Sequence, residues 1–312
     1  MVMLKRVKMS EFLSVTAKPK KKTIEELMSE KKLTLNQNDD KYLISSGDRQ
    51  IWISTNQNIY IKTIMWFFDY YFDSVEFENI GDFKVVDFSI SRKHKIKGFD
   101  QFEVFCPSVA EPFETIEQYL DFAKLKEGNI VLDLGAYSGL TSIAFSQCVG
   151  ENGKVISLEP DIFNFECVQK NVSENQSFQN IFLENIAVWK ESGFLEFSVE
   201  QNMGSSATIV NGKRGLIKQI PCMTLSAIAK KYNLTNVDFI KCDIEGAEAY
   251  IFEDDEFFQK FKPKIIIETH IVNGSFCDDI CIDRLKKYGY NYSRINQKGL
   301  DMPLIGFEYN DE

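Results

Sequence analysis

Residues 129–139, Asn-Ile-Val-Leu-Asp-Leu-Gly-Ala-Tyr-Ser-Gly (NIVLDLGAYSG), decide the fold. A short apolar run ends at Asp133, and glycines follow at 135 and 139, a pattern typical of a buried strand that turns tightly into a helix. The next segment, GLTSIAFSQCVG (139–150), predicts that helix, with Gly150 at its end. The stretch therefore predicts the first strand–turn–helix unit of an α/β protein.

The same alternation of strand and helix repeats toward the carboxyl end. Four further apolar runs predict buried strands: KVISLEP (154–160), IFLENIAV (181–188), VDFIKCD (237–243) and KIIIETH (264–270). NYSRIN (291–296) and LIGFEY (304–309) predict a closing antiparallel hairpin. Repeated strand–helix–strand units favour a parallel, doubly wound sheet with helices on both faces. In such sheets ligands bind beyond the carboxyl ends of the strands.

Two segments of different composition precede this pattern. Residues 1–40 are basic and polar, with KPKKK at 18–22, and predict a mobile arm with a short helix near 23–30. Residues 41–111 are rich in aromatic and β-branched residues. They predict a small α/β extension or lid of short strands with one buried helix near 59–72. The ligand-binding domain is then expected over 112–312.

Composition and charge exclude several classes of protein. The 312 residues include 46 Asp and Glu against 36 Lys and Arg, a net charge of −10 that argues against a nucleic-acid partner. No run approaches the roughly 18–20 apolar residues of a membrane helix, and we expect neither a membrane span nor a signal peptide. Seven scattered cysteines are typical of reduced thiols, which predicts a cytoplasmic protein. The oligomeric state is left open.

Residues at the ends of the first three strands predict a nucleoside site. The loop Gly135-Ala136-Tyr137-Ser138-Gly139 lets the backbone approach a ligand, and the acidic Asp133 before it suits a cofactor with a cationic amino-acid part. Glu159, followed by Pro160, can accept both hydroxyls of a ribose. Asn185-Ile186-Ala187 are predicted to line an adenine pocket. A plain βα turn and a surface carboxylate near a helix start remain the alternatives.

The fourth and fifth strands end in the residues expected to carry the chemistry. The fourth ends in Lys-Cys-Asp-Ile-Glu-Gly-Ala-Glu (241–248), whose charges are costly at the end of a buried strand unless they have partners. The lysine of that run is expected to pair with one of its carboxylates. Glu268 and His270 end the fifth strand on one face, near Asp243. His270 can take a proton from a substrate hydroxyl, and a plain surface histidine is the alternative.

Together, these motifs in their order resemble the FkbM family of S-adenosylmethionine-dependent methyltransferases. The matching pieces are VLDLGAYSG, VISLEP, ENIAV, GSSA, VDFIKCDIEGAE and IIIETH, spread over about 113–310. The most diagnostic piece is the K-x-D-x-E-G-A-E run at 241–248. The first loop departs mildly from the family, with Tyr137 and Ser138 where the family often carries Asn and a small aliphatic residue.

The resemblance implies a Rossmann-like class I methyltransferase fold, a doubly wound seven-stranded sheet whose last strand is antiparallel. It implies O-methyl transfer from S-adenosyl-L-methionine, leaving S-adenosyl-L-homocysteine, to a hydroxyl of a sugar, glycan or natural product. Asp243, which also borders the cofactor, and His270 are expected nearest this acceptor. Glu268 is expected to orient the imidazole or contact the acceptor. Asp243 and Glu268 could instead bind Mg²⁺, but two carboxylates are few ligands, so no metal is expected.

Two other functions and the identity of the acceptor stay open at this point. A nicotinamide-dependent oxidoreductase would share the sheet and the acidic ribose contact, although the missing third glycine opposes it. A non-catalytic binding module would keep the fold as a scaffold. Residues 193–222, with Gly204-Ser205-Ser206, are expected to form one wall of the acceptor pocket. Trp52, Trp66 and Tyr70 are candidates for stacking on a sugar, with core packing as the alternative.

Overall fold

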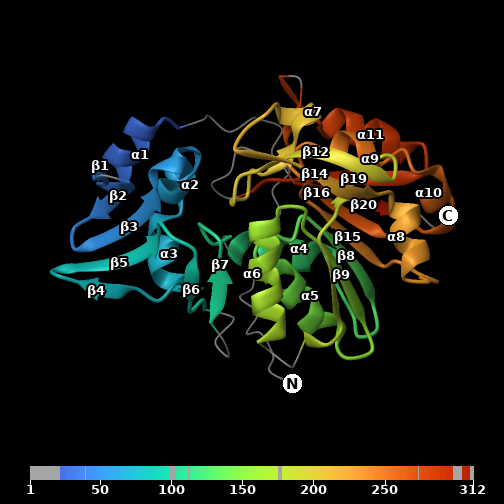
Figure 1. Ribbon diagram of the computed structural model, residues 1–312, viewed down its shortest axis with the longest axis horizontal. Helices are drawn as coiled ribbons and strands as arrows, with labels where there is room; N and C mark the ends of the chain where they lie inside the picture. Colours follow the sequence, from blue (N-terminus) through green and yellow to red (C-terminus); the bar gives the residue numbers. More distant parts are fainter. Residues whose placement is uncertain are drawn as a thin grey trace. The chain divides into compact units, whose positions relative to one another are not determined.

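The computed structural model describes residues 22–38, 40–97, 103–111, 113–174, 178–272, 274–297 and 304–309. Its contacts divide the chain into two compact units (Figure 1). The N-terminal unit comprises Met1–Asp87 and His94–Glu103, and the C-terminal unit comprises Phe88–Lys93 and Val104–Glu312. Each unit has its own sheet and is described by itself.

The N-terminal unit is a five-stranded sheet with short helices, in the order β1-β2-β3-β5-β4. Its elements are α1 (Ile24–Lys31), β1 (Thr34–Asn38), β2 (Lys41–Ser46), β3 (Arg49–Ser54), the 3-10 helix η1 (Thr55–Tyr60), α2 (Ile61–Trp66), α3 (Phe68–Ser74), β4 (Glu78–Ile80) and β5 (Phe83–Phe88). The helix expected near 59–72 is split into α2 and α3 because Phe67 leaves the helical conformation, at φ −93° and ψ 17°.

The second half of the segment expected to be a mobile arm is folded. The short helix expected near 23–30 is α1, and its Leu27 is fully buried. Strand β1 then pairs with β2 over five residues. Apolar burial and strand pairing thus order a stretch whose charge pattern alone suggested solvation, while residues 1–21 lie outside the described residues.

The C-terminal unit is built on a seven-stranded sheet, in the order β10-β9-β8-β15-β16-β20-β19 (Figure 1). The strands are β8 (Ile130–Leu134), β9 (Lys154–Leu158), β10 (Ile181–Glu184), β15 (Phe239–Cys242), β16 (Lys264–Glu268), β19 (Tyr290–Ile295) and β20 (Leu304–Tyr309). The first five in spatial order are parallel, and β20 is antiparallel to both its neighbours. The predicted doubly wound sheet with an antiparallel last strand is confirmed.

Helices cover both faces of this sheet (Figure 1). They are α4 (Phe113–Ala123), α5 (Leu140–Val149), α6 (Ile162–Ser173), α8 (Leu225–Lys231), α9 (Glu248–Ile251), α10 (Asp255–Lys260) and α11 (Asp278–Lys286). Two short helices, α9 and α10, follow β15, and Asp254 caps α10 while its carboxylate also accepts the backbone N–H of Ser226 in α8. Leu132 and Leu134 of β8 face the core shared with α8, α10 and α11. Asp133, between them, points to the opposite face, toward α5.

Residues 187–223 contain all four strands of a second sheet, in the order β11-β14-β12-β13. Its elements are β11 (Ala187–Val188), β12 (Gly193–Val199), β13 (Ser206–Ala207), α7 (Thr208–Asn211) and β14 (Leu216–Met223). The chain leaves the main sheet after Glu184 and enters the second sheet at Ala187. The strand expected over 181–188 is therefore shared between two sheets. Two small pairs, β6 (Arg92–His94) with β7 (Val104–Cys106) and β17 (Ile271–Val272) with β18 (Ser275–Phe276), complete the fold.

The cysteines and the helix lengths bear on two further expectations. All seven cysteines are free thiols, and every one except Cys148 is buried. They pack as small apolar side chains, as expected. Among the described residues, no helix combines the length and the apolar character needed to cross a bilayer.

Candidate active site

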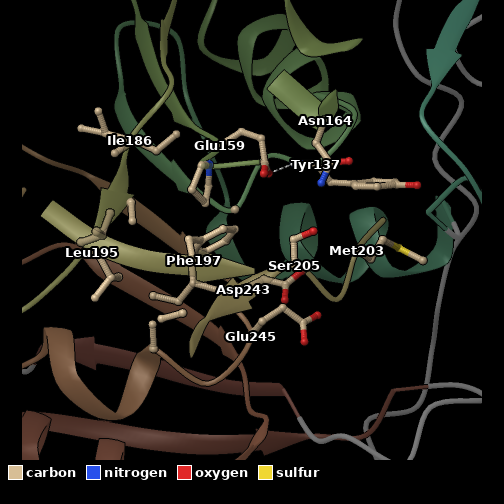
Figure 2. A pocket seen from close by; sticks show the side chains of 18 of the residues that line it. Tyr137, Glu159, Asn164, Ile186, Leu195, Phe197, Met203, Ser205, Asp243 and Glu245 are labelled. Carbon is tan, nitrogen blue, oxygen red and sulfur yellow. Dashed lines mark hydrogen bonds between the residues drawn. The ribbon is translucent and has the colours of Figure 1, made fainter. Parts of the chain in front are cut away.

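A pocket lies at the carboxyl ends of β8, β9 and β15 and is closed on its other side by the second sheet (Figure 2). The pocket, including the part that is open to solvent, has a volume of about 650 Å³. Small-molecule sites typically occupy roughly 300–1,000 Å³. All of its lining residues belong to the C-terminal unit. The carboxyl-end location is the one expected for a ligand site in a doubly wound sheet.

The loop after β8 brings its backbone against the end of β15. Gly135 has φ +81°, and a Cβ added there would lie 1.8 Å from the carbonyl oxygen of Asp243. Tyr137, also at positive φ (51°), lines the pocket beside Gly135. Its phenol donates to the carbonyl of Val109 at 2.8 Å. The other predicted loop residues shape this turn without lining the pocket: Ala136, Ser138 and Gly139.

Glu159 is held rigidly at the end of β9 with its side chain 5% exposed. Its Oε2 accepts the backbone N–H of Tyr137 at 2.8 Å, and its Oε1 accepts that of Asp161 at 2.9 Å. Burial and the nearby Asp161 carboxylate raise the pKa of Glu159 to about 8, although the backbone hydrogen bonds oppose this. Pro160 lines the pocket beside it, whereas Asn185 turns away and donates to the Glu159 carbonyl at 2.8 Å.

One end of the pocket is apolar. Ile186 and Ala187, both predicted from the sequence, lie in the connection from β10 to β11 and line this end. Leu195 and Phe197 of β12 also line it, and Figure 2 shows Leu195 near Ile186 with Phe197 further in. Side chains alternate between the two faces of a strand, and in GFLEFSV (193–199) Leu195 and Phe197 fall on the same face. Phe194 falls on the other face and is 76% exposed. This alternation is the sequence signal that marks Leu195 and Phe197.

Asp161, which is not among the residues predicted from the motifs, ties the second sheet to the main one. Its Oδ1 caps α6 by accepting the N–H of Phe163 at 2.9 Å. Its Oδ2 accepts the N–H groups of Glu200 and Gln201, each at 3.0 Å, and the hydroxyl of Ser205 at 2.6 Å. An aspartate directly before an apolar-periodic helix is an N-cap signal, so this residue could have been identified.

Asp133 and Lys241 form a buried charged layer beneath the glycine loop. Lys241 Nζ donates to the carbonyl of Gly135 at 2.6 Å and lies 3.7 Å from Asp133 Oδ1 and 3.4 Å from Asp243 Oδ2. Burial alone would lower the pKa of Lys241, but the Asp243 and Asp133 carboxylates raise it above its usual range. The expected pairing of this lysine with Asp243 is present.

Asp133 supports the loop from below and does not line the pocket. Its Oδ2 accepts the hydroxyls of Thr141 at 2.6 Å and Ser142 at 2.5 Å, both on the first turn of α5. Burial raises its pKa, while Lys241 and these two hydroxyls oppose the rise. Asp133 therefore fixes where α5 begins relative to β8.

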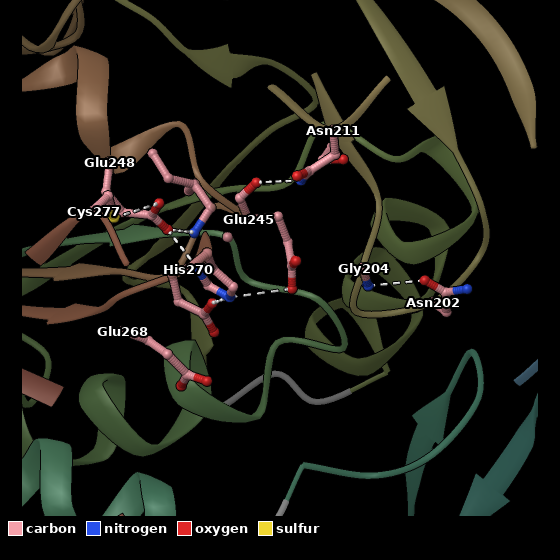
Figure 3. Close-up of polar contacts among 12 residues, drawn as sticks. Asn202, Gly204, Asn211, Glu245, Glu248, Glu268, His270 and Cys277 are labelled. Carbon is pink, nitrogen blue, oxygen red and sulfur yellow. Dashed lines mark hydrogen bonds and ion pairs between the residues drawn. The ribbon is translucent and has the colours of Figure 1, made fainter. Parts of the chain in front are cut away.

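A chain of charged side chains runs from the pocket to His270 (Figure 3). His270 Nε2 lies 3.4 Å from Glu245 Oε1 and 3.6 Å from Asp243 Oδ1. On the other side, His270 Nδ1 lies 3.0 Å from Oε1 of the fully buried Glu248, which also accepts the N–H of Ile244 at 2.8 Å. Burial opposes protonation of His270, but Glu245 and Glu248 together raise its pKa well above the usual value.

Two of these interacting charged side chains reach the pocket, whereas two residues that were predicted for the site do not. Asp243 and Glu245 line it, with side chains 21% and 24% exposed. His270 and Glu268 lie behind them, outside the pocket lining. Glu268 accepts the phenol of Tyr119 at 3.0 Å, and burial together with Asp243 raises its pKa to about 7. The carboxylate in hydrogen-bond contact with the imidazole Nδ1 is thus Glu248, where Glu268 was expected.

The geometry also bears on the metal alternative. Within the described residues, Asp243, Glu248 and His270 each offer a ligand atom, and these atoms lie within 4.8 Å of one another. In the structure they interact directly, because Glu248 Oε1 is already engaged by His270 and by the N–H of Ile244. Of the two carboxylates in the Mg²⁺ alternative, Asp243 belongs to this group, whereas Glu268 accepts the phenol of Tyr119.

The residues predicted for the acceptor pocket fall in both units. Ser205 lines the pocket, while Gly204 and Ser206 accept hydrogen bonds from the guanidinium of Arg214 at 2.8 and 3.0 Å. The three aromatic candidates belong to the N-terminal unit, where each has local partners. Trp52 donates to Gln50, the carbonyl of Trp66 accepts from Lys31, and Tyr70 packs on Phe67 and Tyr71.

Comparisons with solved structures find methyltransferases at low sequence identity. A precorrin-6y C5,15-methyltransferase from Geobacter metallireducens GS-15 is 14% identical, with 65% of this chain and 90% of that chain covered at a TM-score of 0.42. A methyltransferase FkbM from Methylobacillus flagellatus KT is 15% identical, with 62% and 50% covered at 0.39. An Aeropyrum pernix fibrillarin in complex with S-adenosyl-L-methionine is 14% identical, with 88% and 97% covered at 0.39.

A family model gives the more specific assignment. No curated protein matches the sequence. The model described as "Methyltransferase FkbM domain" matches residues 133–292, which is just over half of the chain. The matched range starts at Asp133 and includes Glu159, the K-x-D-x-E-G-A-E run and His270. The chain therefore belongs to the FkbM family of methyltransferases.

Proposed function

We propose that this methyltransferase transfers a methyl group from S-adenosyl-L-methionine to a hydroxyl of a sugar, glycan or natural-product acceptor, leaving S-adenosyl-L-homocysteine. One observation carries the proposal. A single pocket joins a buried carboxylate at the end of β9, an apolar slot beside it and two carboxylates after β15. This sequence of surfaces suits the ribose, the adenine and the methyl-bearing part of the cofactor. Membership of a methyltransferase family argues against the nicotinamide-dependent oxidoreductase.

The pocket residues fit the cofactor part by part. Glu159, fixed by two backbone N–H groups, would accept the ribose hydroxyls. Ile186 and Ala187, with Phe197, would surround the adenine. The absence of a side chain at Gly135 would let the methionine part approach the loop. The predicted residues outside the lining would act indirectly: Asp133, Ala136, Ser138, Gly139 and Asn185 shape the loop and the strand ends.

Bound S-adenosyl-L-methionine would supply an electrophilic methyl group, and the chain must orient the acceptor and receive its proton. Holding two reactants in line can contribute roughly 7–11 kcal/mol. Asp243 lines the pocket, so we assign it as the carboxylate that accepts the hydroxyl proton. Glu245 and Glu248 favour the protonated form of the His270 imidazole by raising its pKa, and we assign His270 to positioning and charge balance. Glu268, which lies behind the pocket lining and acts electrostatically on Asp243, would support this wall from behind.

Calorimetry with S-adenosyl-L-homocysteine tests the cofactor assignment. The intact chain should bind it, and Glu159→Ala should weaken binding by about tenfold or more, a loss of ~1.4 kcal/mol or more. Glu166→Gln is the control, because Glu166 lies exposed on α6 away from the pocket. No binding by the intact chain, or equal losses in both variants, would contradict the proposal.

Mass spectrometry on a panel of glycans and small alcohols then tests the reaction. Asp243→Asn should reduce methyl transfer more than it reduces S-adenosyl-L-homocysteine affinity. Transfer should survive excess EDTA, whereas loss that Mg²⁺ restores would support the metal alternative. Cofactor binding without transfer to any hydroxyl would favour a non-catalytic module or another acceptor atom.

A further inference from the structure

A carboxylate in the pocket wall lacks the partner that its burial calls for. Glu111 precedes α4, outside the range 133–292 that the family model matches, and it lines the pocket with Gly135 and Tyr137. Its Oε2 is buried and, within the part of the chain that the structure describes, has no hydrogen-bond partner. Burying such a group without a partner is costly, so an unpaired one in a pocket points to a ligand group that it meets.

The neighbours of Glu111 locate it at one end of the pocket. The charged groups that interact with it are Lys241, Asp243, Asp133 and Glu268. These residues cluster at the ends of β8, β15 and β16, beneath and beside the Gly135 loop. Glu111 therefore belongs with Gly135 and Asp243 among the residues that line the pocket, at the end where the methionine part of the cofactor would lie.

This end of the pocket gathers several carboxyl groups around one lysine. Lys241 is the cation that acts on Glu111, and its Nζ is already engaged by the Gly135 carbonyl and by Asp133 and Asp243. Burial, with Asp243 adding to it, raises the pKa of Glu111 to about 8 against the attraction of Lys241. The fourth carboxylate therefore has an unmet preference for a positive partner.

We propose that Glu111 binds the α-ammonium group of the methionine part of S-adenosyl-L-methionine. The inference rests on the proposed function, because it takes this pocket to be the cofactor site. An ammonium brings hydrogen-bond donors to the unpaired Oε2 and stabilises the ionised form of the Glu111 carboxyl, and charge-assisted bonds of this kind are the strong ones. A neutral hydroxyl would not stabilise the ionised carboxylate in this way.

Calorimetry with two probes separates the ammonium from the rest of the cofactor. S-adenosyl-L-homocysteine carries the amino-acid part, and 5′-methylthioadenosine keeps the nucleoside and thioether but lacks it. Glu111→Gln keeps the size of the side chain and removes its charge, and Glu166→Gln is the exposed control. Glu111→Gln should bind S-adenosyl-L-homocysteine about 10- to 100-fold more weakly and 5′-methylthioadenosine as the wild type does. The control should bind both unchanged.

Other outcomes overturn the inference. Unchanged affinity for S-adenosyl-L-homocysteine would show that Glu111 meets no cation there. Equal losses for both probes would mean that it shapes the pocket as a whole. A loss seen only with S-adenosyl-L-methionine would assign it to the sulfonium instead. Failure of the wild type to bind S-adenosyl-L-homocysteine would instead refute the proposed function itself.

Proton release gives an independent readout on the same variants. A carboxyl that holds a proton at pH 7 must lose it when an ammonium binds, so wild-type binding should release more protons than Glu111→Gln binding. Calorimetry in two buffers of different ionisation enthalpy measures this number. Because Glu159 could also release a proton, only the difference between the two chains counts. Equal release from both would contradict the role of Glu111.

Discussion

Replacing Gly135 with alanine tests the closest backbone approach at the site. The new Cβ would lie 1.8 Å from the carbonyl oxygen of Asp243, where real contacts are essentially never under 3.0 Å. The ends of β8 and β15 must therefore separate, and the 2.6 Å hydrogen bond from Lys241 to Gly135 is lost. A left-handed alanine costs about 1–2 kcal/mol, and a hydrogen bond from a charged donor about 1.5–3 kcal/mol. We expect Gly135→Ala to lower the free energy of unfolding by about 3–5 kcal/mol.

Gly128→Ala is the matched control for this experiment. Gly128 has φ +84°, close to the +81° of Gly135, but a Cβ there would meet nothing within 4 Å. It should lose only the ~1–2 kcal/mol of backbone strain, so urea unfolding of the two variants isolates the steric contribution. Gly135→Ala should also lose affinity for S-adenosyl-L-homocysteine, whereas Gly128→Ala should keep it. Equal destabilisation of the two variants would refute the reasoning.

Two further predictions concern the buried carboxylates beside the pocket. Asp161→Ala removes the acceptor of the Glu200 and Gln201 N–H groups. Hydrogen exchange at these two amides should therefore accelerate, and the free energy of unfolding should fall by about 2–4 kcal/mol. Unchanged exchange would contradict the anchoring role of Asp161. The second prediction concerns pH. The pKa of Glu159 is about 8 in the folded chain, against 4.5 for an ordinary glutamate, so between these values the folded chain keeps a proton that the unfolded chain loses. The stability of the ligand-free chain should therefore fall as the pH rises from about 5 to 8. Urea unfolding across this range should give a slope steeper than that of Glu159→Gln by up to about 1.4 kcal/mol per pH unit, and parallel slopes would show that Glu159 does not titrate there.

The main sheet could be predicted because its strands carry strong local signals. Each parallel strand is a short apolar run bounded by glycine or charge, and the repeated strand–helix–strand units indicate a parallel sheet. The second sheet could not be foreseen in the same way. Strand β11 has two residues, and it continues an apolar run that begins in the main sheet, so no local feature marks the change of sheet.

The site was predictable where a side chain follows strand alternation and not where the backbone turns. Glu159 and Asp243 emerge at strand ends and line the pocket as expected. Glu245 and Gly246 both adopt positive φ, at 55° and 97°, which ends the alternation and brings Glu245 to the pocket. Glu111 lies outside the range 133–292 that the family model matches and outside the motifs quoted above, and only the folded chain shows it beside them.

Asp161 sets how the walls around the pocket can move. Its single carboxylate accepts hydrogen bonds from the first turn of α6 and from the backbone of Glu200 and Gln201. These bonds fix the 199–205 stretch to the end of the main sheet. Widening of the entrance therefore requires movement elsewhere in the second sheet. The turn through α7 to Gly212 makes none of the Asp161 contacts and is held instead by Asn211, which donates to the carbonyl of Glu245, and by Ser198, which donates to the carbonyl of Gly212. Relatives that differ in acceptor size would be expected to diverge along that turn first, while keeping an oxygen acceptor at position 161.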